Sequence, residues 1–300
     1  MLRPDQNGTT IPDESSRPAL SASALKLRLL KRLKCTTRFE KAAWSTGAKL
    51  VAGVDEVGRG SLFGCVAAAA CILNPDDRIR GLRDSKLLAP EVREKLAPRI
   101  RKRAIAWSVA EVDVGKIDEI NIYHASLLAM KLAVERLEPR PDYLLIDAVT
   151  IDFDCPQKKI IHGDALSASI AAASILAKVH RDAILRSLDS VYPQYGLAHN
   201  KGYATPFHKL ALREHGPSPL HRQSWAAVAA LRAEQLPLDL CDPELGVSEL
   251  GVSELGVSEL GVSELGVSEL NVSLLNNEEL AAEQLEISEE MDTEMEGSEE

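Results

Sequence analysis

Short apolar runs separated by glycines fill the middle of the chain. They read "KLVAGVDEV", "GCVAAAACIL" and "AIAWSVAEV", with "DYLLIDAV" and "KKIIHG" further along. Runs of four to eight such residues, bounded by turn signals, are typical of strands. The pattern therefore predicts five strands, within residues 49–57, 64–73, 104–112, 142–149 and 158–163.

Three other segments have the spacing of helices. Residues 89–103 carry Pro90 near their start, where a helix tolerates proline. Residues 115–137 are spaced like a long amphipathic helix, and residues 167–188 are rich in small residues, as in a buried helix. Three strands followed by a helix–strand–strand–helix series predict an α/β fold with a mixed five-stranded sheet flanked by helices.

The two ends of the chain differ from this middle part. Residues 1–20 are polar and rich in Pro and Ser, which favours disorder, and residues 21–44 predict one or two basic helices. "GVSEL" recurs five times from Gly246 to Leu270, a period that suits neither a helix nor a strand. We therefore expect an N-terminal extension (1–38), a folded domain (39–232) that ends in a small helical part, and a disordered acidic tail (233–300).

Charge is divided in the same way. The formal net charge is −10, but the first 232 residues hold 35 basic and 25 acidic groups, a net charge of +10. The basic body could attract a polyanion, and an ordinary mixed-charge surface would look the same. The five cysteines lack CxxC spacing, which favours reduced thiols. With no signal-peptide pattern and no apolar stretch near the eighteen or so residues of a membrane span, we expect a cytoplasmic protein.

Acidic residues stand where the predicted strands end. Asp55 and Glu56 close the first strand, Asp147 lies in the apolar run "LLIDAV", and Asp164 follows the fifth strand. Clustered carboxylates repel one another unless protons or cations intervene, and hard divalent ions such as Mg²⁺ take oxygen ligands. Such a cluster suits two-metal phosphodiester hydrolysis, with ions about 3.5–4 Å apart. Asp164 alone could equally be a helix N-cap.

Six blocks of the sequence resemble the bacterial ribonuclease HII family in the same order along the chain. They are "GVDEVGRG", "LRDSK", "NI…A…AM", "GDALSASIAAASILAKVHRD", "YGLAHNKGYAT" and "GPSPLHRQSW". The resemblance runs from about Phe39 to Arg232. It implies a ribonuclease-H-like fold in residues 39–232 and cleavage of the RNA strand of RNA–DNA hybrids, or of a ribonucleotide within duplex DNA, leaving 5′-phosphate and 3′-OH ends.

The resemblance also assigns roles to individual residues. It makes Asp55, Glu56, Asp147 and Asp164 the catalytic acids that bind Mg²⁺ or Mn²⁺. It makes Gly58, Arg59 and Gly60 the motif that reads the ribose 2′-OH, the group that distinguishes RNA from DNA. Tyr203 would pack on the sugar that follows the scissile phosphate. The chain departs from the family pattern at Ser61, Cys65, His162 and Ala204, none of which is an expected metal ligand.

Two other functions remain open at this point. One is a catalytically idle nucleic-acid-binding module, which the four acids disfavour. The other is a broader hybrid nuclease that needs several consecutive ribonucleotides, which the Gly-Arg-Gly motif and Tyr203 disfavour. We expect a monomer.

The start of the tail suggests a further partner. Gln235, Leu236, Pro237, Leu238, Asp239 and Leu240 resemble the short glutamine–leucine motif by which bacterial replication and repair proteins dock on the sliding clamp. An extended peptide can insert leucines into an apolar pocket while a glutamine anchors one end. An ordinary leucine-rich linker is the alternative.

Overall fold

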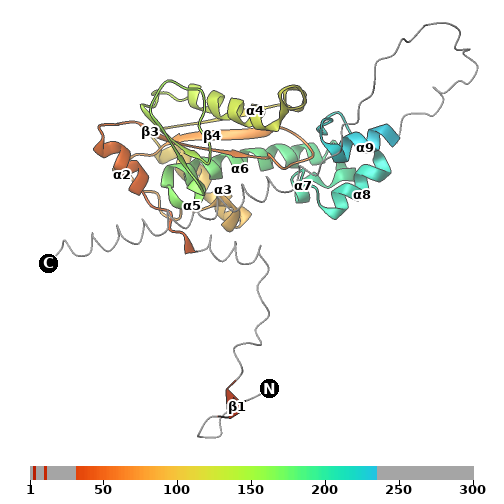
Figure 1. Ribbon diagram of the computed structural model, residues 1–300, viewed down its shortest axis with the longest axis horizontal. Helices are drawn as coiled ribbons and strands as arrows, with labels where there is room; N and C mark the ends of the chain where they lie inside the picture. The colour runs from red at the N-terminus through yellow and green to blue at the C-terminus, as the bar shows by residue number, and fades with distance from the viewer. Residues whose placement is uncertain (1–2, 5–9, 12–31, 235–300) are drawn as a thin grey trace, which may run out of the picture. The chain divides into compact units, whose positions relative to one another are not determined.

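The computed structural model describes residues 3–4, 10–11 and 32–234 (Figure 1). These residues belong to two compact units, one ending at Trp225 and one beginning at Ala226. Of the predicted acidic tail (233–300), only the first two residues are described, at the end of a helix; the "GVSEL" repeats and the clamp-like motif lie outside the described residues. No helix in the described part is long and apolar enough to cross a membrane.

A five-stranded mixed sheet forms the centre of the first unit, as predicted. Its order is β5-β4-β3-β6-β7. Strand β4 runs antiparallel to both β5 and β3, whereas β6 runs parallel to both β3 and β7. The strands are β3 (Val51–Val57), β4 (Val66–Ile72), β5 (Ala106–Val112), β6 (Tyr143–Asp147) and β7 (Gln157–Ile160).

Helix α4 (Val114–Glu135) covers one face of this sheet (Figure 1). Its Ala125, Ala129 and Met130 pack with Val54 and Ile146 in one apolar cluster. The helix is interrupted at Asn121, whose φ of 64° is left-handed and whose side chain accepts a hydrogen bond from the backbone of Tyr123. The predicted single helix is therefore two helical segments, with Asn121 capping the second.

Helices α6 (Ala168–Asp189) and α3 (Pro90–Arg103) cover the opposite face. Helix α6 comes so close to β3 that a Cβ on Gly53 would lie 2.1 Å from the backbone of Ser169. The small residues of α6 and the alanines of β4 allow this close packing, and both are fully buried along most of their length.

Shorter elements complete the fold. One or two basic helices were expected in residues 21–44; in the described part of this range residue 32 is helical, residues 33–37 form no helix, and α2 begins at Arg38. The two-residue strands β1 and β2 pair with each other. These elements are β1 (Arg3–Pro4), β2 (Thr10–Ile11), α2 (Arg38–Ser45), η2 (Ser85–Leu87), α5 (Gly163–Leu166), η3 (Pro193–Tyr195), α7 (Leu197–Asn200), α8 (Pro206–His215) and α9 (Ala226–Glu234).

Candidate active site

The two central parallel strands bring Asp55 and Asp147 to the same level of the sheet. Val54 of β3 pairs with Ile146 of β6, so the next residue on each strand is an aspartate. Strand β3 continues to Val57, so Asp55 and Glu56 lie within the strand. The sequence pattern places them at its end. Asp55 is only 5% exposed, and the Ser174 side chain of α6 favours the ionised form of Asp55 by lowering its pKa.

Asp164 reaches this end of the sheet from helix α5. The helix follows β7 and begins after His162, which adopts a left-handed φ of 56°. The backbone N–H of Gly163 donates to Asp147 Oδ1 at 2.8 Å, so the start of α5 is tied to the end of β6. Asp164 is buried inside the first turn and is not an N-cap, because the N-cap residues of α5 and α6 are His162 and Ser167.

Glu56 joins the same group. Alternation along β3 points Asp55 and Glu56 to opposite faces of the sheet. The Glu56 carboxylate nevertheless raises the pKa of both Asp55 and Asp147 through its charge. The structure therefore brings all four predicted acids to one end of the sheet.

Burial and mutual repulsion shift the protonation of this cluster. Loss of solvation, then the charges of Asp147, Glu56 and Asp164, hold the pKa of Asp55 well above its usual range. Burial, then the charges of Asp164 and Glu56, raise the pKa of Asp147 to about 7. Carboxylates in this state bind a proton or a cation more readily than isolated ones.

Two cationic side chains contact the cluster. Lys86 Nζ lies 3.1 Å from Asp164 Oδ2, and Arg59 Nη1 lies 3.3 Å from Glu56 Oε1. In the described part of the chain, no three His, Cys, Asp or Glu side chains are grouped so that they could hold a metal ion. The chemistry of the donor set nevertheless fits a hard divalent ion, because four carboxylates supply oxygen ligands and repel one another. To bind such an ion, Asp164 and Glu56 would exchange their contacts with Lys86 and Arg59 for contacts with the metal.

Sequence reasoning missed other members of this site. Asp84, a buried acid of the "LRDSK" block, has its pKa raised by burial and by the charge of Asp164. Lys86 of the same block contacts Asp164, whereas the sequence offered no reason to prefer it over other exposed lysines. The one signal in the sequence was the spacing within this block, which places Asp84 two residues before Lys86.

The Gly-Arg-Gly turn follows β3 directly. Gly58 is buried with a φ of +95°, and a Cβ on it would lie 2.3 Å from Arg181 Nε. Gly60 is exposed, and a Cβ on it would meet no atom within 4 Å. Gly58 is thus required by the fold itself, whereas the space above Gly60 is open to solvent.

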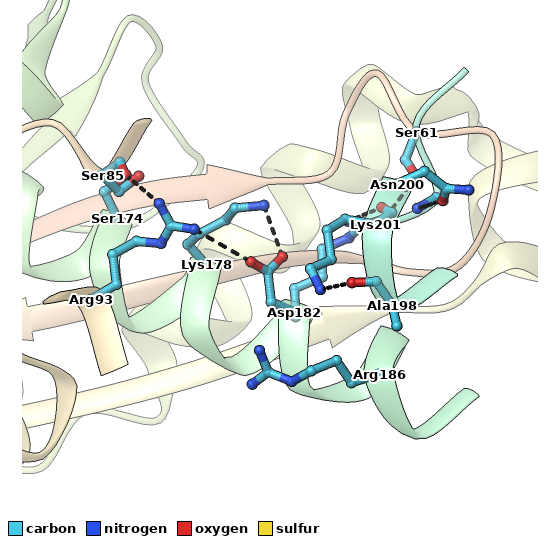
Figure 2. A network of polar contacts seen from close by, with 12 residues as sticks. Ser61, Ser85, Arg93, Ser174, Lys178, Asp182, Arg186, Ala198, Asn200 and Lys201 are labelled. Atoms are coloured by element: carbon cyan, nitrogen blue, oxygen red, sulfur yellow. Dashed lines mark hydrogen bonds and ion pairs between the residues drawn. The ribbon is translucent and has the colours of Figure 1, made fainter. Parts of the chain in front are cut away.

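Tyr203 lies next to this turn, because Ser61 and Tyr203 form an isolated β-bridge. Lys178 of α6 places its ammonium 5.7 Å from the centre of the Tyr203 ring. Asp182, one turn further along α6, holds Lys178 Nζ at 2.8 Å and lies 3.7 Å from Arg93 (Figure 2). Asp182 is therefore a structural ion-pair partner. Lys201 donates to the carbonyl of Ala198.

Two buried histidines, His208 and His221, are linked to the backbone of Tyr203 by hydrogen bonds. His208 Nδ1 contacts the Tyr203 carbonyl at 2.9 Å, and the two Nε2 atoms of His208 and His221 are 3.1 Å apart. His221 Nδ1 accepts from the Ser218 backbone at 2.9 Å. These contacts require Nδ1–H on His208 and Nε2–H on His221, so neither ring can take a further proton without losing a bond. Burial, then the neighbouring His208, lowers the pKa of His221 to about 3.

Comparisons with known proteins agree with the fold and the site. A structure of the ribonuclease H2 from Pyrococcus horikoshii OT3 matches with a TM-score of 0.55 at 25% identity, covering 62% of this chain and 98% of that one. The structure of the PCNA:RNase HII complex from Archaeoglobus fulgidus matches with a TM-score of 0.53 at 27% identity, covering 63% and 99%. The mixed sheet and its acidic end thus define a nuclease of the ribonuclease H class.

The sequence comparisons identify the family within this class. The family model for ribonuclease HII matches residues 52–228. Ribonuclease HII of Koribacter versatilis (strain Ellin345) is 62% identical over 235 residues, which cover 78% of this chain and 91% of that protein. The chain therefore belongs to the ribonuclease HII family, whose members are metal-dependent endoribonucleases that act on RNA–DNA hybrids.

Proposed function

We propose that Asp55, Glu56, Asp147 and Asp164 bind Mg²⁺ or Mn²⁺ and carry out two-metal hydrolysis that leaves 5′-phosphate and 3′-OH ends. The observation that carries this assignment is the convergence of four acids from β3, β6 and α5, where burial and the neighbouring carboxylate charges raise the pKa values of Asp55 and Asp147. A bound divalent cation would activate water and stabilise the leaving oxygen. The catalytic domain spans residues 39–232.

The protein's own groups prepare this reaction. The Gly163 N–H and the Ser174 hydroxyl favour the ionised forms of Asp147 and Asp55. Lys86 lowers the pKa of Asp147 by its charge. Its ammonium is attached to a side chain that is 76% exposed, so it can leave Asp164 for a substrate phosphate.

We further propose that Gly58, Arg59, Gly60 and Tyr203 read the ribose at an RNA–DNA junction, so that one ribonucleotide within duplex DNA suffices for cleavage. Three features support this. Arg59 and Gly60 are exposed beside the acids, the space above Gly60 is open, and Tyr203 is bridged to Ser61 at the end of the turn.

One assay tests both proposals. A labelled DNA duplex with one internal ribonucleotide is incubated with Mg²⁺ or Mn²⁺ beside an all-RNA/DNA hybrid. We expect both to be cleaved, and we expect Arg59→Ala and Tyr203→Ala to reduce cleavage of the single-ribonucleotide duplex more than they weaken its binding, since phosphate contacts supply most of the affinity. Wild-type cleavage rates in both variants would refute junction reading.

We also propose that residues 235–240 dock on the sliding clamp. The support is the sequence motif and the relative from Archaeoglobus fulgidus that is in complex with PCNA. A peptide covering residues 232–243 should bind the clamp with micromolar-class affinity, about −8 kcal/mol, in a fluorescence-anisotropy titration. Binding that is unchanged when Gln235 and Leu238 become alanine would refute the assignment.

A further inference from the structure

We propose that Arg222, together with Arg181, is a positioning residue that fixes the orientation of the peptide groups in the Gly-Arg-Gly turn. This rests on the proposed junction reading by that turn. Both arginines are fully buried, and both form hydrogen bonds to the segment 58–65. Neither was singled out by the sequence.

Arg222 contacts the turn from beneath with its whole guanidinium. Nη2 donates to the carbonyl of Gly58 at 2.7 Å, and Nη1 donates to the carbonyl of Arg59 at 2.8 Å. Nε and Nη2 reach the carbonyls of Gly64 and Cys65, at 3.1 and 3.3 Å. One rigid fork thus joins the two ends of the loop that follows β3.

Because the peptide bond is planar, these contacts also fix the direction of the neighbouring backbone N–H groups. In a trans peptide the C=O and the next N–H point in opposite directions. Because the carbonyls of Gly58 and Arg59 point at the buried guanidinium, the N–H groups of Arg59 and Gly60 point away from it. Neither N–H is used in the hydrogen bonds formed among the described residues. Arg222 therefore leaves two adjacent backbone donors available for a ribose hydroxyl.

Arg181 fixes the same loop to the segment that carries Tyr203. Its Nη2 donates to Ser61 Oγ at 2.8 Å, and its Nη1 donates to the Lys201 carbonyl at 3.0 Å. Nε reaches the Cys65 carbonyl at 2.9 Å. Ser61, one of the positions where the chain departs from the family pattern, is thus a hydrogen-bonding partner of Arg181. Figure 2 shows Ser61, Asn200 and Lys201 gathered at this point beyond α6.

The backbone of Arg222 is itself fixed on both sides. Asp118 of α4 accepts hydrogen bonds from the N–H groups of Gln223 and Ser224, both at 2.9 Å. The N–H of Arg222 donates to the Leu62 carbonyl at 2.9 Å, and the preceding His221 belongs to the pair of histidines linked to Tyr203. The "HRQSW" block is therefore a support for the turn, which gives that part of the sequence a role that its chemistry alone does not suggest.

The chemistry of these contacts argues against a merely stabilising role. Among the described residues, neither guanidinium forms an ion pair with a carboxylate, and all their acceptors are carbonyls and one hydroxyl. Burying two cations without counter-ions is costly, and the hydrogen bonds to the loop carbonyls offset that cost. What a guanidinium provides, and an apolar side chain does not, is a fixed direction for several carbonyls at once.

The test is Arg222→Lys, which keeps the charge and loses the fork. We expect its kcat/KM on a single-ribonucleotide duplex to fall roughly 10- to 100-fold, mainly in kcat, as for a slightly misplaced reading group. On an all-RNA/DNA hybrid, which offers many ribonucleotides, the loss should be smaller. The substrate ratio, kcat/KM on the single-ribonucleotide duplex divided by kcat/KM on the hybrid, should therefore fall. Amide hydrogen exchange at Ser61 and Leu62, whose N–H groups donate to the carbonyls of Gly58 and Gly202, should quicken, while exchange at residues 143–147 stays unchanged.

The matched control is Tyr195→Phe. It removes another buried bond to a carbonyl, that of Gly216 at 2.8 Å, without touching the turn. It should lower stability and leave the substrate ratio unchanged. If Arg222→Lys fails to fold, Ser61→Ala removes one partner of Arg181 and should lower the ratio by roughly fivefold, the effect of one lost hydrogen bond.

The outcomes separate the two proposals. A wild-type enzyme that does not cleave the single-ribonucleotide duplex would refute junction reading, and the exchange data would still show whether Arg222 orders the turn. A ratio that stays at the wild-type value in Arg222→Lys, or in Ser61→Ala if that variant is used, would refute the positioning role even where stability falls.

Discussion

Two charged regions of this protein lie side by side and are organised in opposite ways. At the acidic end of the sheet, burial and the charges of neighbouring carboxylates raise the pKa values of Asp55 and Asp147, and Lys86 and Arg59 pair with Asp164 and Glu56. Beneath the neighbouring turn, Arg181 and Arg222 are buried with no carboxylate partner among the described residues, yet each donates four hydrogen bonds.

This difference separates carboxylates suited to bind a cation from arginines that hold the backbone of the turn in place. The carboxylates repel one another in the folded protein, and an added cation would relieve that repulsion. The guanidiniums have their acceptors within the chain and need nothing from outside. Substitutions should therefore have opposite effects on stability in the two regions, although they lower activity in both.

The largest effect should follow Asp147→Asn. Activity should be lost, by a factor on the order of 10³ or more, because the metal ligand set is broken. The metal-free protein should nevertheless become more stable at pH 8, because an ionised Asp147 is disfavoured in the folded state. If about 1 kcal/mol of repulsion is relieved, Tm should rise by roughly 2–4 °C in thermal unfolding with chelator present.

The control for this variant is Asp152→Asn, which removes an acid that is 94% exposed and pairs with Lys131. It should change neither activity nor Tm appreciably. Normal turnover in Asp147→Asn would show that Asp147 is not a metal ligand.

A second contrast compares the two glycines of the turn. Gly58→Ala should destabilise the protein by about 1–3 kcal/mol, because it combines a positive φ with a clash against Arg181. Gly60→Ala should leave Tm within a degree or so of wild type, since its Cβ enters open space, yet should weaken cleavage of the single-ribonucleotide duplex. Thermal unfolding and the cleavage assay, run on both variants, check this. Equal losses of stability would remove the distinction.

The third prediction concerns pH. Raised carboxylate pKa values mean that the folded state binds more protons than the unfolded state between about pH 4 and 7, so the cluster makes the metal-free protein less stable as pH rises. The lowered pKa of His221 has the opposite effect between about pH 3 and 6.5, where stability rises with pH.

Single substitutions should separate these two slopes. In urea unfolding at several pH values with chelator, Asp147→Asn should make the dependence of unfolding free energy on pH more positive between pH 4 and 7. His221→Gln should make it less positive below pH 6.5. Unchanged slopes in both variants would contradict the assigned protonation states.

The smallest effect should come from Lys86→Gln. The Lys86 charge lowers the pKa of Asp147, so its loss should move the acid limb of the pH–activity profile upward, by less than about one pH unit. Steady-state rates at saturating metal between pH 5.5 and 8.5 would measure this. A shift to lower pH would contradict the contact with the cluster.

The sequence was sufficient for the elements whose residues show a local pattern. All five strands, and the helices α3 and α6, appear where periodicity predicts them. The break at Asn121 was missed, because it depends on one residue's backbone conformation inside an otherwise helical pattern.

The candidate site divides in the same manner. The four acids and the Gly-Arg-Gly motif could be found because polar residues interrupt apolar runs or match a family pattern. Arg181 and Arg222 could not, since their partners lie 116 to 164 residues away in the chain or in loops without a pattern. The same holds for the pairing of His208 with His221, where spacing indicates no zinc site and says nothing of hydrogen bonding.

The most direct measurement of the central claim is calorimetric titration of the metal-free protein with Mn²⁺ near pH 6.5, in two buffers of different ionisation enthalpy. We predict saturable binding with net proton release in the wild type, because the pKa of Asp147 is raised to about 7 and this carboxyl is partly protonated at that pH. We predict the same in Arg222→Lys and a loss of binding in Asp147→Asn. Undiminished binding in Asp147→Asn, or wild-type binding without proton release, would contradict the view that the acidic cluster is the metal site.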